Sequence, residues 1–162
     1  MWDTFTATLG QLHQQYEKIH ALQEKKREIL VALDMEALEK LTAEESFLAA
    51  AVQTLEKQRL MQLAQIAQET PGVTPETTME ELALLAPTDG IHRAVLGASR
   101  KLSLLVKAVQ ERSEANAFLM EGLLIAVNRQ LGKIGGTVVD PVYGSGGGEQ
   151  VRHLKKNLDY EA

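Results

Sequence analysis

The sequence predicts an all-α fold: an elongated, antiparallel bundle of three long, coiled-coil-like helices, with short connecting helices and a flexible C-terminal tail. Three observations predict it. Apolar residues recur at alternating spacings of four and three residues along three long stretches. Hydrophobic residues make up 44% of the 162 residues but aromatic residues only 4%, a composition that suits packing between helices. Strand signals are nearly absent, the longest β-branched run being Thr137-Val138-Val139.

The first long helix is expected from Trp2 to Leu33. Gln23 and Lys26 interrupt its apolar seam near the middle, where a polar layer would fix the register against a neighbouring helix. The seam positions follow the spacing 4, 3, 4, 3 throughout: Phe5, Leu9, Leu12, Tyr16, Ile19, Gln23, Lys26, Leu30 and Leu33.

The second long helix is expected from Ala43 to Glu69, after a separate short turn over Met35–Leu41. Thr42, with Glu45 three residues later, has the spacing of a capping box, which marks a helix start. Thr70-Pro71-Gly72 is a strong helix stop.

A short connecting helix is expected next, because Thr78 and Glu81 form another capping-box pattern and Pro87 ends the segment. The third long helix should then run from Asp89 to about Leu131, with Gly132 just past its last apolar turn. At 1.5 Å per residue this helix would be about 60 Å long. Its seam keeps the same spacing: Ile91, Val95, Ala98, Leu102, Leu105, Val109, Arg112, Asn116, Leu119, Leu123, Ala126 and Gln130.

A helix of this length cannot bury its apolar stripe alone, and the sequence leaves two arrangements open. The three seams close either within one chain or between two copies in a homo-oligomer. We expect the bundle domain to span residues 1–135 and the tail to span residues 136–162. The tail holds Asp140-Pro141 and the run Gly144–Gly148, which disfavour regular structure.

Composition narrows the function classes. The net charge of −5 argues against a nucleic-acid partner, since phosphate binding needs a concentrated basic face. The absence of cysteine excludes disulfides and thiolate metal sites and fits a cytoplasmic location. The start of the chain lacks the pattern of a signal peptide, and no apolar stretch approaches the length of a membrane span, so we expect no membrane insertion.

We expect no enzyme activity, no cofactor and no metal. Glu17 and His20 have the Glu-x-x-His spacing that di-iron bundles use twice, but the pattern occurs once here. His13 and Glu17, four residues apart, favour the simpler interpretation of a surface pair on a helix. A carboxylate-bridged metal enzyme is therefore the weakest of the hypotheses.

Asn116 divides the third helix into two parts. In one interpretation it forms, with Arg112, a polar layer that sets the register inside the bundle. In the other, the seam packs on the chain's own bundle before Asn116 and is offered to another protein after it. The turns from Phe118 to Val127 are apolar nearly all round, which is typical of deep burial or of a binding face.

The order of elements and the C-terminal sequence resemble a known family. Residues 116–128 read Asn-Ala-Phe-Leu-Met-Glu-Gly-Leu-Leu-Ile-Ala-Val-Asn, and Pro141-Val142-Tyr143-Gly144 follows in a polar, glycine-rich tail. The chain resembles the FlgN-type chaperones of bacterial flagellar export. The resemblance implies a small cytoplasmic helical protein that binds flagellar hook–filament junction proteins and delivers them to the type III export gate.

The resemblance also implies site residues. The client-binding segment of the family is its C-terminal amphipathic region, which corresponds here to Leu119, Leu123, Leu124, Val127 and Leu131. Tyr143 matches a tail position that docks on the cytoplasmic domain of the export-gate membrane protein. The alternative hypothesis is a coiled-coil homodimeric structural or adaptor protein without a secreted client.

Overall fold

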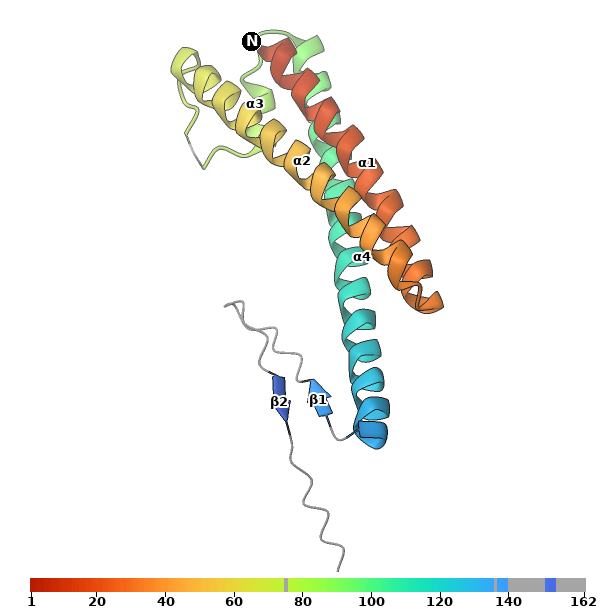
Figure 1. Ribbon diagram of the computed structural model, residues 1–162. Helices are drawn as coiled ribbons and strands as arrows, with labels where there is room; N and C mark the ends of the chain where they lie inside the picture. Colours follow the sequence, from red (N-terminus) through yellow and green to blue (C-terminus); the bar gives the residue numbers. More distant parts are fainter. Residues whose placement is uncertain (75, 136, 140–150, 154–162) are drawn as a thin grey trace, which may run out of the picture. The chain divides into compact units, whose positions relative to one another are not determined.

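The computed structural model describes residues 1–74, 76–135, 137–139 and 151–153, with side chains for residues 1–74 and 76–135. Four helices follow one another: α1 (Trp2–Ala32), α2 (Met35–Glu69), α3 (Met79–Leu84) and α4 (Asp89–Gly135). The predicted all-α helical bundle is confirmed (Figure 1). The chain divides into two compact units, Met1–Glu114 and Ala115–Ala162, so α4 begins in the first unit and ends in the second.

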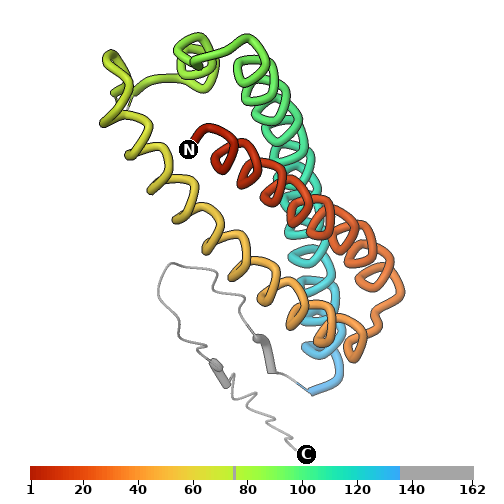
Figure 2. The backbone as a smooth tube through the Cα atoms, turned by 90° about the horizontal axis from the view of Figure 1, so that it is seen from above, coloured from red at the N-terminus to blue at the C-terminus, as the bar shows by residue number. Residues whose placement is uncertain are grey.

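In the unit Met1–Glu114, α1 and α2 form a helical hairpin and lie side by side (Figures 1 and 2). Gln23 of α1 contacts Glu45 of α2, and Phe5 lies in the same cluster as Ile66, so the two helices are antiparallel. The α4 helix runs parallel to α1 here, because Leu9 clusters with Ala98 and Glu24 pairs with Arg112.

The main core lies where all four helices meet. Trp2, Phe5 and Leu9 of α1 pack with Ile66 of α2, Leu82 and Ala83 of α3, and Val95 of α4. A second cluster of Leu22, Leu41 and Leu48 joins α1 to α2 nearer their connecting turn. Trp2 and Phe5 are the aromatic side chains of the first cluster, and the buried residues of the second cluster are all leucine.

The sequence-predicted break before the second long helix is wrong, since α2 is continuous from Met35. Asp34 is its N-cap, and the Asp34 carboxylate accepts a hydrogen bond from the Ala37 amide at 3.0 Å. Thr42 lies inside the helix and donates its hydroxyl to the Leu38 carbonyl at 2.8 Å. Its spacing to Glu45 therefore caps nothing, because Glu45 points toward α1 instead.

The polar interruption of the first seam makes a defined contact. Glu45 accepts a hydrogen bond from Gln23 at 2.7 Å and pairs with Lys26 at 2.8 Å. Leu33, in contrast, is not a seam residue as predicted. The α1 helix ends at Ala32, and Leu33 adopts a left-handed conformation (φ 55°) with 54% of its surface exposed.

The short connecting helix is confirmed with its capping box. Thr78 accepts from the Glu81 amide at 3.2 Å, and the Glu81 carboxylate accepts from the Thr78 amide at 2.8 Å. The α3 helix is only six residues long, yet two of its residues are buried in the main core. It therefore anchors the connection between α2 and α4 rather than forming a free linker.

The α4 helix extends to Gly135, four residues beyond the predicted end near Leu131, because a single glycine at position 132 does not stop it. Two short strands, β1 (Thr137–Val139) and β2 (Val151–His153), pair antiparallel, with Val138 opposite Arg152. They lie in the segment predicted to hold no regular structure, and β1 is the β-branched run of the sequence. The predicted domain boundary after residue 135 stays a prediction.

Candidate partner-binding surface

The final turns of α4 carry an unusual amount of exposed apolar surface. Leu119, Leu123, Leu124, Val127 and Leu131 are spaced four, one, three and four residues apart, so they share one side of the helix. Leu119 and Leu123 are half-buried, whereas 37% of Leu124, 46% of Val127 and 47% of Leu131 are exposed. The structure thus brings the five predicted residues together on one helical face, which we call the α4 apolar face.

The local sequence explains why this face is presented on a regular helix. Residues 115–131 contain no proline, and their leucine, alanine and methionine side chains favour the helical conformation. Gly122 is the one glycine in that stretch, and the helix passes through it. The face is therefore held by backbone hydrogen bonds along α4.

Sequence analysis missed one member of the α4 apolar face. Ile134 lies seven residues after Val127 on the same side of the helix, and 81% of its surface is exposed. It was missed because Gly132 was interpreted as the end of the helix. The signal was present in the chain, since Leu131 and Ile134 continue the helical spacing of the earlier apolar residues.

A second apolar strip lies on the opposite side of the same turns. Phe118 and Ile125 are seven residues apart, with 79% and 42% of their surfaces exposed. The prediction that these turns are apolar nearly all round is therefore matched by exposed side chains in two directions. Deep burial, the other interpretation of that pattern, does not account for Phe118.

Two polar residues of α4, Arg112 and Asn116, precede the apolar face. Arg112 forms an ion pair with Glu24 of α1. Asn116 has only 1% of its surface exposed. Both residues are therefore set apart from the exposed turns that follow, and the role of Asn116 in fixing the register stays a prediction.

The remaining predicted residues are Tyr143 of the tail and His13, Glu17 and His20 of α1. Tyr143 lies outside the described residues. His13 and Glu17 form the predicted pair, with His13 Nδ1 3.6 Å from a Glu17 carboxylate oxygen. His20 is half-buried on α1. Within the described ranges, no three histidine, aspartate or glutamate side chains are grouped so that they could hold a metal ion.

Each helix in the described part of the chain is too polar or too short to cross a bilayer.

One of the comparisons with known proteins finds a match. A family model described as FlgN protein matches residues 1–150 of the chain. No curated protein and no solved structure matches. Since the match covers nearly the whole sequence, the chain belongs to the FlgN family of flagellar export chaperones.

Proposed function

We propose that this protein is a cytoplasmic chaperone that binds flagellar hook–filament junction proteins on the α4 apolar face and delivers them to the type III export gate. The observation that carries the proposal is the exposure of Leu124, Val127, Leu131 and Ile134 on one side of a regular helix. Membership of the FlgN family supports the general role in flagellar export.

The recognition mode follows from the chemistry of the face. It offers aliphatic side chains at helical spacing and no charged residue among its members, so it suits the apolar side of an amphipathic client helix. Burying a Leu-sized side chain contributes roughly 1.5–3 kcal/mol before the ordering of the client is subtracted. Four or five such contacts are enough for binding in the micromolar range or tighter.

The client site is tested with the triple variant Leu119→Ala, Leu123→Ala, Val127→Ala. We expect the affinity for a purified junction protein, measured by titration calorimetry, to fall by about 100-fold, since three truncated contacts remove roughly 3 kcal/mol. The matched control is Leu60→Ala, Met61→Ala, which shortens two exposed apolar side chains of α2. Full affinity in the triple variant would refute the assignment of this face.

The same turns of α4 also allow the second candidate function, a homodimeric adaptor without a client. Phe118 and Ile125 favour it, because they expose a further apolar strip on the same turns. Light scattering at several concentrations separates the two functions. A tight dimer that resists dilution and refuses junction proteins would favour the adaptor, whereas a one-to-one complex with a junction protein would favour the chaperone.

Delivery to the export gate is assigned to the tail, with Tyr143 as the docking residue. We expect Tyr143→Ala to weaken binding to the cytoplasmic domain of the gate protein while leaving the affinity for the client unchanged. Tyr160→Ala changes the other tail tyrosine and serves as the control. Equal losses in both variants would remove the assignment of Tyr143.

A further inference from the structure

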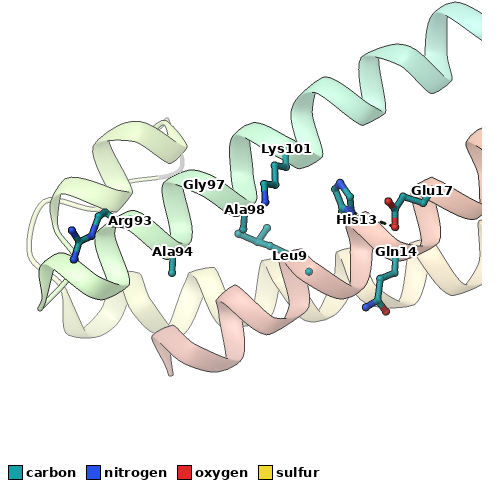
Figure 3. A pocket seen from close by; sticks show the side chains of 10 residues that line it. Leu9, His13, Gln14, Glu17, Arg93, Ala94, Gly97, Ala98 and Lys101 are labelled. Carbon is teal, nitrogen blue, oxygen red and sulfur yellow. Dashed lines mark ion pairs between the residues drawn. The ribbon is translucent and has the colours of Figure 1, made fainter.

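A second surface lies between α1 and α4 within the unit Met1–Glu114. It is an open groove of about 550 Å³ (Figure 3). The two helices run parallel beside it, and each contributes a continuous side over about two turns. The α1 side is formed by Leu9, Gly10, His13, Gln14 and Glu17, and the α4 side by Arg93, Ala94, Gly97, Ala98 and Lys101.

Four of the ten residues that line the groove are very small, namely Gly10, Ala94, Gly97 and Ala98. Glycine inside a helix costs roughly 0.5–1 kcal/mol relative to alanine. A Cβ atom added to Gly10 or to Gly97 would meet nothing within 4 Å. Packing inside the chain therefore does not require glycine at either position, and the missing side chains leave room for a backbone to approach from outside.

The two edges of the groove differ in charge. Arg93 and Lys101 on α4 are exposed and eight residues apart, which is about 12 Å along the helix. Neither forms an ion pair with a carboxylate of the described residues. The α1 edge carries Glu17, which pairs with His13 (Figure 3). One edge is therefore cationic and the other bears a carboxylate.

We propose that this groove binds one α-helix of a partner protein. The helix has small apolar side chains on its inner side, carboxylates about two turns apart along the edge that faces Arg93 and Lys101, and a Lys or Arg on the edge that faces Glu17. Helices pack at axis distances of 8–10 Å, and the shortest of these distances need small residues at the contact, which the groove supplies. The charges make the groove selective for such a helix, because each edge of the groove then faces partner side chains of the opposite charge.

This site is separate from the α4 apolar face and does not depend on the proposed function. Its residues all precede Glu114, and its recognition is by charge and close approach rather than by large aliphatic side chains. A phosphate-rich partner fits less well, since Glu17 lies on one edge and only two cations lie on the other.

The experiment uses the full chain and a capped 16-residue helical peptide. The peptide carries Ala and Leu on one side, Glu at positions 4 and 12 along one edge, and Lys along the other. We expect saturable binding near 100 µM, and backbone amide NMR shifts at Gly10 and Gly97. A peptide with both Glu replaced by Gln should bind at least tenfold more weakly.

Protein variants then test the charges. The variant Arg93→Glu, Lys101→Glu should bind the acidic peptide at least tenfold more weakly. A peptide with Lys in place of both Glu should restore binding to that variant. Arg100→Glu, Lys107→Glu makes the same change of charge on the same helix outside the groove, and it should leave the affinity within twofold.

A steric test is independent of charge. Gly97→Leu should fold, because space is open around the glycine, and it should abolish peptide binding. Circular dichroism and thermal unfolding check the fold of every variant. The proposal is overturned if the acidic peptide does not bind at 1 mM (about ten times the expected Kd), if its shifts map to the α4 apolar face, or if the two charge-reversal variants lose the same affinity.

Discussion

At the scale of single residues, Glu45 is the clearest link between sequence and packing. Its carboxylate accepts from Gln23 and pairs with Lys26, and both Lys26 and Glu45 have less than a fifth of their side-chain surface exposed, at 16% and 18%. Partly buried charges need their partners, because removing one partner leaves the other charge shielded from water without compensation. One carboxylate thus joins α1 to α2 at a fixed register.

We therefore expect Glu45→Ala to lower the free energy of unfolding by about 1–3 kcal/mol. Urea denaturation followed by circular dichroism measures the change. Glu36→Ala is the matched control, since its pair with Lys40 has 80% and 75% of the side-chain surfaces exposed. The control should change stability by less than about 0.5 kcal/mol. Equal effects in the two variants would show that the Glu45 contact does not stabilise the hairpin.

Glu81 makes a prediction about pH. Hydrogen bonds from the Thr78 backbone, and then from its side chain, hold the pKa of Glu81 below its ordinary value of 4.5. Because the folded pKa is lowered, the stabilising contribution is present above pH 4.5 and is lost as the pH falls through the folded value. The capping box should therefore weaken in acid.

An NMR titration of the Glu81 carboxyl checks this. We expect Thr78→Ala to raise the pKa of Glu81 only in part, because the backbone donor, which has the larger effect, is retained. A Glu81 titration unchanged by Thr78→Ala would exclude a contribution from the side chain.

At the scale of elements, the turn between α1 and α2 contains a residue that is poorly suited to its conformation. Leu33 has φ 55°, a left-handed conformation that glycine adopts more easily. The Asp34 amide donates to the Ile29 carbonyl at 3.2 Å, so the left-handed Leu33 forms part of a Schellman-type end of α1. Since Leu33 is also exposed, little packing is lost when its side chain is removed.

We expect Leu33→Gly to raise the free energy of unfolding by about 0.5–1 kcal/mol, as relief of the left-handed strain exceeds the added flexibility of the unfolded chain. Ala32→Gly, at the preceding helical position, should lower it by a similar amount. Denaturation midpoints of the two variants should thus move in opposite directions. A shift in the same direction would show that the strain at Leu33 is not relieved by glycine.

The errors of sequence analysis at this scale have a common cause. Local patterns such as Thr42 with Glu45, or a single Gly132, are start and stop signals only when nothing longer-ranged competes. Glu45 is held by Gln23, 22 residues away, and the helix continues through the supposed start. Where a signal agreed with packing, as at Thr78 and Glu81 beside the buried Leu82, the predicted helix is present.

At the scale of the whole molecule, the three long helices follow from apolar periodicity. The five residues predicted to bind the client share one face because helical spacing alone requires it. The groove between α1 and α4 could not be predicted in this way. Gly10 and Gly97 are 87 residues apart in the sequence, and only the parallel packing of two helices brings both to one surface. Periodicity identifies a face, but it does not identify which faces become neighbours.

The distribution of the core leads to the last prediction. Both hydrophobic clusters, and the contact of Glu45 with Gln23 and Lys26, lie entirely before Glu114. A chain that ends at Glu114 should therefore retain a cooperative unfolding transition, measured by urea denaturation, while losing all affinity for junction proteins, since it lacks the α4 apolar face. An unfolded fragment would show that later residues are needed for the core. A folded fragment with full client affinity would move the client site into the first unit, and the Arg93→Glu, Lys101→Glu variant would then show whether the groove holds the client.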